Sequence, residues 1–390
     1  MSDTPVKAPA SPYNKNNPFL AKITSKSVLN KTGSEKETRH IVIDLSGSGL
    51  QYSPGYSIGV FGTNDPAAAD ELLALLALSP SAPIAQKDGS TKPLRDLLIK
   101  EYTLNRAGTK LVKALAEKLP AGAAKDRYAA LVADEAKLAE FIFTRDVFDV
   151  FQDSGFKPAS AEELLEMINK SVPRLYSIAS SQAKHPNEVH LTVAIVRYET
   201  HGRKKKGLVS GYLADHTTLG ESNVPIFVAP NKHFKLPEDP ATPVIMVGPG
   251  TGIAPFRAFL EQREMDGAKG PNWLFFGDQR QSLDFLYEDE FAAWQTSGLL
   301  TKLSTAFSRD QAQKVYVQDR MKENAAELWS WLQKGAYFYV CGDAKRMAKD
   351  VHQTLIAIAQ EHGGMSLEAA TEYIEKTLAK DERRYLRDVY

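Results

Sequence analysis

Apolar and polar residues alternate differently in three parts of this chain, and each pattern predicts a different kind of structure. Near the N-terminus, short apolar segments separated by turn residues, such as residues 39–45 and 53–61, predict antiparallel strands. From residue 65 to about residue 170, Ala, Leu, Glu and Lys recur at helical spacing, which predicts an all-helical insertion. Strand patterning returns at residues 175–178, 188–198 and 225–228. The strands before and after the insertion can therefore close one antiparallel β-barrel.

The pattern changes after Pro243, where apolar strands alternate with helical segments. These strands are expected at residues 244–247, 273–277, 300–307 and 337–343. Such alternation predicts a parallel sheet with helices on both faces, whose ligands bind beyond the carboxyl ends of the strands. The predicted fold class is a β-barrel with a helical insertion, followed by an α/β domain.

A glycine-rich turn, residues 248–252, separates the first of these strands from an amphipathic helix. Glycines let the backbone approach a ligand, and the N–H groups and dipole of a helix start favour a phosphate. The turn, which contains Gly250 and Thr251, is therefore a candidate phosphate site. The spacing is G-x-G-x-G, and Ile253 stands where the dinucleotide fingerprint requires glycine, so a plain Rossmann dehydrogenase is not the best match. A strand-to-helix turn without a ligand remains the alternative.

Composition excludes several classes of protein. The 48 basic and 48 acidic side chains cancel, so no overall charge favours nucleic acid or an anionic membrane. The single cysteine, Cys341, excludes an internal disulfide and a cysteine-ligated cluster, and we expect no metal site and a cytoplasmic location. Residues 1–17 contain no hydrophobic signal core and are expected to form a flexible tail or linker.

Three further segments carry candidate chemistry. Arg174 and Tyr176 can share one face of a strand, where they would offer a guanidinium to a phosphate and an aromatic plane to a flavin, although a tyrosine packed on the core explains them equally well. Residues 207–210 open a helix that could hold a pyrophosphate or could simply be capped. The basic run 203–206 is expected to be a solvated hairpin loop, with docking of an acidic partner as the alternative.

Seven motifs occur together in register: PRLYSIASS, TVAIVRY, TPVIMVGPGTGIAPFRAF, NWLFFGDQR, SRDQAQKVYVQDRM, YVCGDAKRMAKDV and RRYLRDVY. In this order they resemble the reductase half of NADPH–sulfite reductase flavoproteins, and more broadly the diflavin reductases related to cytochrome P450 reductase and ferredoxin–NADP reductase. The resemblance extends from residue 11 to residue 390 and lacks the upstream flavodoxin-like FMN domain. It implies a FAD-binding barrel at 18–64 and 171–237, a helical connecting insertion at 65–170, and an NADP-binding domain at 238–390.

The resemblance also implies which residues hold the cofactors FAD and NADPH, with no FMN within this chain. Tyr176 would lie against one flavin face, with Ser177 near N5, and Tyr390 would stack on the other face and move aside for nicotinamide. Ser177, Cys341 and Asp388 would be the polar group that orients nicotinamide during hydride transfer. The other implied FAD contacts are Thr103, Arg174, Leu175, Thr192, Val193, Ala194, Tyr198, Gly207, Leu208, Val209 and Ser210.

For the nucleotide, Asp278 would in an ordinary Rossmann domain bind a ribose hydroxyl and favour NAD, but the resemblance implies a 2′-phosphate site after the third strand. Two cations and several hydroxyl groups suit a dianionic phosphate, so NADPH is the expected nucleotide. The implied contacts are Ser308, Arg309, Lys314, Val315, Tyr316, Val317, Gln318 and Asp350.

These features predict an NADPH-dependent FAD flavoprotein reductase that passes electrons singly to an FMN domain or flavodoxin-like carrier, and through it to a sulfite reductase haemoprotein. A stand-alone NADPH–ferredoxin or flavodoxin reductase is the neighbouring alternative. A non-catalytic flavin-binding subunit is a third reading, against which the presence of Ser177, Cys341, Asp388 and Tyr390 together argues.

Overall fold

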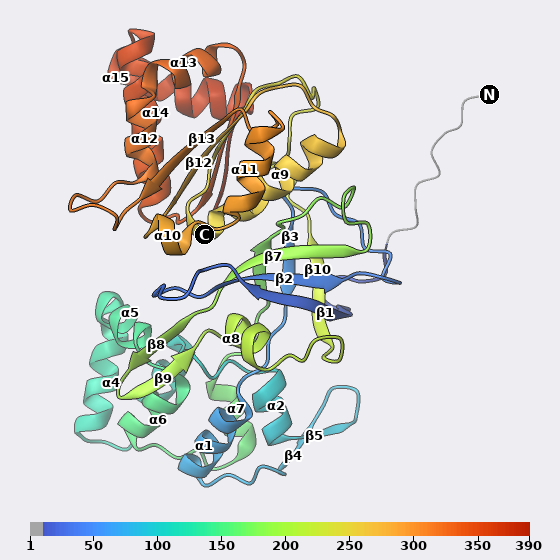
Figure 1. The fold of residues 1–390 in the computed structure, drawn as a ribbon. Helices are drawn as coiled ribbons and strands as arrows, with labels where there is room; N and C mark the ends of the chain where they lie inside the picture. The colour runs from blue at the N-terminus through green and yellow to red at the C-terminus, as the bar shows by residue number, and fades with distance from the viewer. Residues whose placement is uncertain (1–10) are drawn as a thin grey trace. The chain divides into compact units, whose positions relative to one another are not determined.

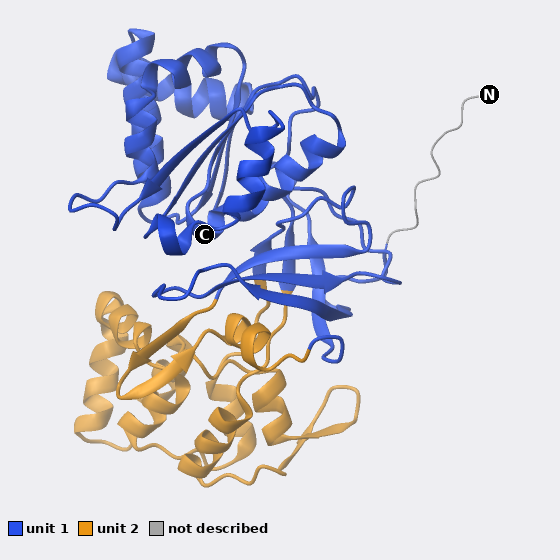
Figure 2. Cartoon of the chain, viewed as in Figure 1, with its two compact units in different colours: residues 1–59, 175–194, 219–390 blue, residues 60–174, 195–218 orange. Residues whose placement is uncertain are grey.

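The computed structural model describes residues 11–390, which form two compact units (Figure 2). Unit 1 comprises Met1–Gly59, Leu175–Ala194 and Leu219–Tyr390, and unit 2 comprises Val60–Arg174 and Ile195–Thr218. Of the expected tail, residues 1–10 lie outside the described part. Within residues 11–17, Ser11 Oγ donates to the Ser48 carbonyl at 3.2 Å and Tyr13 packs on Phe19, so this part is attached to the barrel strands.

The first sheet of unit 1 is the barrel-like sheet that the N-terminal patterning predicts. Its strands lie in the order β6-β3-β10-β1-β2-β7, and β2 pairs antiparallel with both β1 and β7. Their bounds are β1 Phe19–Val28, β2 Thr38–Asp44, β3 Ser57–Val60, β6 Arg174–Ser177, β7 Glu188–Ala194 and β10 Val224–Ala229. Strands from both sides of the insertion therefore share one sheet, as expected.

The second sheet of unit 1 is parallel, as the alternating pattern after Pro243 predicts (Figure 1). Its order is β13-β12-β11-β14-β15, with bounds β11 Val244–Val247, β12 Asn272–Asp278, β13 Lys302–Phe307, β14 Tyr337–Gly342 and β15 Tyr385–Val389. Four of these strands match the sequence prediction. The fifth, β15, was not predicted, and it pairs parallel with β14 at the edge of the sheet.

Both faces of this sheet are apolar because successive side chains of a buried strand point to opposite sides. From β11, Ile245 and Val247 pack in one core, while Val244 and Met246 pack in the other. The first core is covered mainly by α12 Val317–Glu323, α13 Ala325–Gln333, α14 Met347–Gly363, α15 Leu367–Glu372 and the π-helix Tyr373–Asp381. The second is covered by α9 Ala254–Met265, by α11 Glu288–Thr296 and by the segment that joins α11 to the short helix α10 Gln281–Asp284.

Unit 2 is largely helical and has its own apolar core. Its helices are α1 Pro66–Leu76, α2 Leu94–Lys100, α3 Thr109–Lys118, α4 Ala123–Ala133, α5 Glu135–Phe143, α6 Val147–Ser154, α7 Ala161–Met167 and α8 Leu208–Asp215. The prediction of an all-helical insertion is wrong at one point, because a hairpin joins β4 Pro83–Ala85 to β5 Thr91–Pro93. The D-G-S turn at 88–90, with Gly89 at φ 81°, provides its reversal. A second hairpin pairs β8 Arg197–Thr200 with β9 Arg203–Lys206.

No helix among residues 11–390 is both long enough and apolar enough to cross a lipid bilayer.

Candidate functional site

The glycine turn after β11 forms a short 3-10 helix, Gly250–Ile253, that leads directly into α9. Packing explains two of its glycines: a Cβ on Gly248 would lie 2.5 Å from the Gly252 carbonyl oxygen, and one on Gly252 would lie 2.2 Å from the Cys341 carbonyl oxygen. Gly250 is different, because it has a φ of 57° and lines a cavity. Close packing therefore explains Gly248 and Gly252, whereas the position of Gly250 fits a backbone that faces a ligand.

A cavity of about 560 Å³ lies at the carboxyl ends of β11, β12, β13 and β14, all within unit 1. This is the edge of a parallel sheet at which nucleotides bind. Six residues expected at the nucleotide site line it: Gly250, Ser308, Tyr316, Val317, Gln318 and Asp350. Gln318 Nε2 also donates to Asp350 Oδ2 at 3.3 Å, so the side chains of α12 and α14 meet at its rim.

Asp278, at the end of β12, is already engaged in a way that disfavours NAD-type recognition. Its side chain is 1% exposed, and Lys36 Nζ donates to its Oδ1 at 2.5 Å. Its Oδ2 is buried without a hydrogen-bond partner in the described part of the chain and lies 3.9 Å from the position of a Cβ on Gly250. Burial raises the pKa of Asp278, while Lys36 opposes that rise. The side chain thus forms an ion pair inside the cavity wall, where it is poorly placed to accept a ribose hydroxyl.

Four residues that line this cavity were not among those expected to bind a nucleotide: Lys36, Asp343, Arg346 and Met347. Asp343 could have been identified from the sequence, because it stands at the carboxyl end of β14 as Asp278 does at the end of β12. Lys36 could not, because it lies on the loop between β1 and β2, which is distant in sequence. This set fits a dinucleotide, because an αL glycine faces the cavity and Lys36 and Arg346 supply positive charge.

Other residues expected to bind the 2′-phosphate lie outside the cavity lining. Arg309 is exposed and forms an ion pair with Glu35, a neighbour of Lys36. Lys314 is exposed, and Val315 is partly buried against the core under α12 and α14. These two cations stand on the loop that follows β13, next to the cavity residue Ser308.

Ser177, Cys341 and Asp388 come together in unit 1 at the ends of β6, β14 and β15. Ser177 Oγ donates to Asp388 Oδ2 at 3.0 Å, and Cys341 is the register partner of Asp388 between the two parallel strands. Burial raises the pKa of Asp388, and the hydrogen bond from Ser177 offsets part of that rise. The three side chains therefore form one polar cluster, as the resemblance implies.

Cys341 approaches this cluster from the protein core rather than from a ligand crevice. Its side chain is fully buried in the apolar cluster under α9, with Tyr339 and Phe256. Burial, and then the charge of Asp388, raise the pKa of the thiol well above its ordinary value, although a hydrogen bond with Ser177 lowers it. The thiol is therefore neutral and reaches the polar cluster from the core side.

Tyr390 is anchored beside the glycine turn. Its amide donates to the Gly342 carbonyl, its own carbonyl accepts from Ala344, and its hydroxyl lies 3.1 Å from Thr251 Oγ1. More than half of the residue, 54%, is nevertheless exposed. An exposed ring held at the end of β15 can move without disturbing the core.

Unit 1 also carries several expected flavin contacts. Leu175 is 54% exposed, Ala194 is exposed, and Tyr176 and Ser177 are partly buried. Thr192 and Val193 are fully buried, and the Thr192 hydroxyl lies 2.7 Å from the Tyr287 hydroxyl. A flavin contact from these two residues would have to come from the main chain.

Unit 2 carries the remaining expected FAD residues. Arg174 is exposed, Tyr198 is 38% exposed, and Thr103 Oγ1 donates to the Lys170 carbonyl at 3.5 Å. Gly207 is the N-cap of α8, whose first turn contains Leu208, Val209 and Ser210. No side chain caps this helix, because Ser210 Oγ instead accepts from the Val196 amide at 3.2 Å. An uncapped helix start with a glycine at its cap fits a pyrophosphate.

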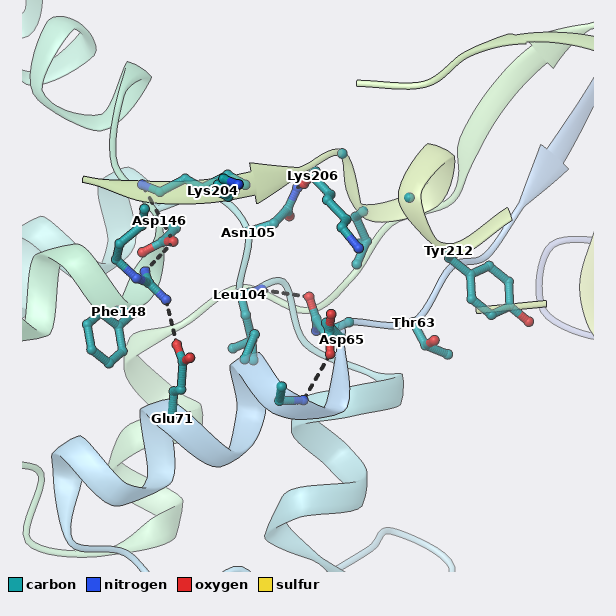
Figure 3. Close-up of a pocket in the computed structure, with 18 of the residues that line it drawn as sticks. Thr63, Asp65, Glu71, Leu104, Asn105, Asp146, Phe148, Lys204, Lys206 and Tyr212 are labelled. Carbon is teal, nitrogen blue, oxygen red and sulfur yellow. Dashed lines mark hydrogen bonds and ion pairs between the residues drawn. The ribbon is translucent and has the colours of Figure 1, made fainter. Parts of the chain in front are cut away.

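The basic run 203–206 is not the solvated loop that the sequence predicts, because it forms β9. Arg203 bonds Asp146 at 2.8 Å and Glu71 at 2.9 Å, and Lys205, 7% exposed, pairs with Asp149. A cavity of about 370 Å³ is lined by residues of β9, α1 and α8, and Figure 3 shows Glu71, Asp146 and Lys206 among its lining side chains. Alternation along β9 leaves Lys204 and Lys206 outward, and Lys206 pairs with Asp215. Half of the run therefore holds unit 2 together rather than facing a partner.

Comparison with known proteins agrees with this arrangement. Residues 11–212 match the family model described as FAD binding domain, and residues 246–353 match the one described as oxidoreductase NAD-binding domain. The chain is 49% identical over 386 residues to the sulfite reductase (NADPH) flavoprotein alpha-component of Sodalis glossinidius. It is 46% identical over 383 residues to the protein of the same name from Serratia proteamaculans.

Each of these alignments covers 98% of this chain and 62% of the relative, so the chain spans less than two thirds of the length of the curated relatives it matches. The resemblance and the fold class predicted from the sequence are confirmed. Since the first family model matches more than half of the residues, the chain belongs to the FAD-binding domain family.

Proposed function

We propose that this chain is an NADPH-dependent FAD flavoprotein reductase that passes electrons to a separate redox carrier. The observation that carries the proposal is the cluster of Ser177, Asp388 and Cys341, which stands at the carboxyl ends of the strands beside the glycine turn. Relatives named as sulfite reductase flavoproteins, and the match to an NAD-binding oxidoreductase domain, support it.

The proposed roles of the residues follow from their positions. Gly250, Thr251 and the cavity residues would bind NADPH, with Lys36 holding Asp278 away from the ribose. Arg309 and Lys314 would swing toward the 2′-phosphate from the loop after β13. The proposed FAD contacts are Thr103, Arg174, Leu175, Tyr176, Ser177, Thr192, Val193, Ala194, Tyr198, Gly207, Leu208, Val209, Ser210 and Tyr390.

When bound, NADPH supplies a hydride and FAD accepts it. The protein residues orient the reactants and stabilise charge. Asp388 accepts the Ser177 hydroxyl hydrogen and so fixes the direction of that hydroxyl. The Asp388 carboxylate stabilises positive charge that develops on a hydride donor, and the buried neutral Cys341 thiol keeps water away from the cluster. Tyr390, whose hydroxyl lies beside Thr251, would cover the nicotinamide position and move aside when the nucleotide enters.

We further propose that the electron acceptor is an FMN domain or flavodoxin-like carrier, which would reduce a sulfite reductase haemoprotein. The names of the relatives support a partner of this kind. The domain boundaries predicted from the sequence, with a FAD-binding barrel at 18–64 and 171–237, an insertion at 65–170 and an NADP-binding domain at 238–390, are part of the same proposal.

Rapid mixing tests the reaction. The protein loaded with FAD is mixed with NADPH without oxygen, and the flavin absorbance is followed; we expect it to bleach, and faster with NADPH than with NADH. A chain that binds no FAD, or a bound flavin that NADPH cannot bleach, would refute the proposal. Turnover with purified flavodoxin, ferredoxin and ferricyanide then identifies the acceptor. Faster reduction of ferredoxin than of flavodoxin would favour a stand-alone ferredoxin reductase.

A further inference from the structure

A group of metal-ligating side chains lies in unit 1, apart from the proposed redox site. His185 lies in the turn before β7, Glu188 begins β7, and His190 follows two residues later on the same face. Each side chain offers a ligand atom, and these atoms all lie within 4.8 Å of one another. Two imidazoles and one carboxylate thus converge where neither NADPH nor FAD is proposed to bind.

The distances within this group are close to those that a bound ion requires. His190 Nε2 lies 3.1 Å from Glu188 Oε2, and His185 Nδ1 lies 3.8 Å from the same oxygen. A tetrahedral zinc ion, bound by nitrogen and oxygen at about 2.1 Å, separates its ligand atoms by about 3.4 Å. These two pairs lie near that figure and every pair lies within 4.8 Å, so side-chain rotations that shorten the widest separation by up to about 1.4 Å would bring the ligands into place.

A second carboxylate fixes the orientation of His185. Glu261 of α9, whose side chain is 1% exposed, accepts from His185 Nε2 at 3.1 Å and from the Ser181 amide at 2.8 Å. With its proton on Nε2, His185 presents the Nδ1 lone pair toward Glu188. Metal-binding histidines are commonly held in this way, by a carboxylate on the nitrogen remote from the ion.

His190 has unused binding capacity. It is 5% exposed, and its Nδ1 is buried with no hydrogen-bond partner in residues 11–390, whereas its Nε2 donates to Glu188. Because Nδ1 has no partner that fixes the tautomer, the His190 proton can move to Nδ1 and leave the Nε2 lone pair toward Glu188.

Three carboxylates lie around this group. Glu261 and Glu290 are paired with the Arg257 guanidinium at 3.0 Å and 2.7 Å. Glu188 therefore supplies the negative charge beside the two imidazoles. The side chain of Glu188 is 43% exposed, which leaves a path for an ion and for a water ligand.

We propose that His185, Glu188 and His190 bind one divalent transition-metal ion of the zinc class, with solvent completing the coordination. Imidazole nitrogens select such ions over magnesium or calcium, which prefer oxygen ligands. On binding, the His190 proton moves from Nε2 to Nδ1 and the ion takes its place beside Glu188, which joins the turn before β7 to the start of that strand. The site is independent of the redox reaction proposed above.

Zinc binding to the full flavin-loaded chain tests the proposal. Isothermal titration with zinc chloride should show one ion per chain, and cobalt chloride should give the intense visible absorption of a four-coordinate ion. Zinc should also raise the Tm progressively with its concentration, since an ion that binds only the folded state stabilises it. The absence of bound zinc in the wild-type chain would overturn the proposal.

Variants locate the ion. Glu188→Gln and His185→Gln change partly exposed side chains, and each should weaken zinc binding by about tenfold or more. His233→Gln, at an exposed histidine elsewhere in unit 1, is the matched control and should bind like the wild type. NADPH–ferricyanide turnover without added metal should be equal in all four proteins, which shows that each is folded. Equal zinc affinity in the wild type and the Glu188→Gln/His185→Gln double variant would contradict the assignment.

Discussion

Replacing Lys36 with methionine should leave a buried carboxylate without its cation inside the nucleotide cavity. Asp278 is 1% exposed, and the Lys36 ammonium is bonded to its Oδ1 at 2.5 Å. The other oxygen, Oδ2, is buried and unsatisfied within the described residues. Methionine keeps most of the length and apolar volume of lysine, so the variant removes mainly the charge.

The expected loss in the free energy of unfolding lies between the values for a buried and an exposed ion pair. Removing one partner of a fully buried ion pair costs about 3–5 kcal/mol, whereas an exposed pair contributes about 0.2–1 kcal/mol. The Lys36 side chain is 32% exposed and Asp278 is buried, so the pair is intermediate. We expect Lys36→Met to lower the free energy of unfolding by about 2 kcal/mol, where solvent screening of the lysine accounts for the reduction from the buried limit.

Urea unfolding of the wild type, Lys36→Met and the double variant Lys36→Met/Asp278→Asn measures this effect. Burial already raises the pKa of Asp278, and loss of Lys36 raises it further. A carboxyl group whose folded-state pKa lies above its unfolded value is more protonated in the folded state, so lowering the pH stabilises the fold. The deficit of Lys36→Met relative to the wild type should therefore shrink from mildly alkaline to mildly acidic pH.

The double variant should recover most of the lost stability, because it removes the unpaired charge itself. The same proteins should differ in nucleotide use. An Asp278 freed from Lys36 can accept a ribose hydroxyl and repel a 2′-phosphate, so the ratio of kcat/KM for NADPH to that for NADH should fall in Lys36→Met. A deficit that is independent of pH and persists in the double variant would refute the reasoning, since it would then arise from packing rather than charge.

Three other substitutions address the remaining features. Ser177→Ala removes the hydroxyl that Asp388 orients, and should slow flavin bleaching by NADPH by about 10²-fold while FAD content is unchanged. Tyr390→Ala should raise kcat/KM for NADH about tenfold, or ~1.4 kcal/mol, because nicotinamide no longer displaces a ring; an unchanged value would contradict its role. Lys205→Met removes a cation that pairs with Asp146 and Asp149, and should lower the free energy of unfolding, measured with urea, by about 3–5 kcal/mol. The exposed control Lys204→Met should change that free energy by less than about 0.5 kcal/mol.

The regular elements could be predicted because their sequence patterns and their burial have the same cause. The run VIMV is apolar at every position since both faces of β11 are covered, and the glycine turn after it marks the end of the strand. The alternation in β2 likewise reflects one buried face. Ser308 after β13 and Asp350 in α14, both expected at the nucleotide site, line the cavity at the ends of the parallel strands.

Residues brought in by distant loops could not be predicted. Lys36 reaches Asp278 across 242 positions of sequence, and no local periodicity records that contact. The prediction that residues 203–206 form a solvated loop was wrong for a related reason. Four consecutive cations indicate a solvated loop unless acidic partners face them, and the partners Asp146 and Asp149 lie more than 50 residues earlier in the sequence. Pairing between charges far apart in sequence depends on the tertiary structure, so the local composition could not show that part of this strand is buried.

Asp388 lies on β15, the strand of the parallel sheet that the sequence pattern did not predict. The segment YLRDV mixes polar and apolar residues, as an edge strand does, and so lacks the apolar run that marks β11 or β14. Its parallel register places Asp388 opposite Cys341 and Val389 opposite Gly342. A slip of one residue would turn Asp388 to the other face of the sheet, away from Ser177. The anchoring of Tyr390 to Gly342, Ala344 and Thr251 opposes such a slip, so the residue proposed to cover the flavin also fixes the register of the cluster beside it.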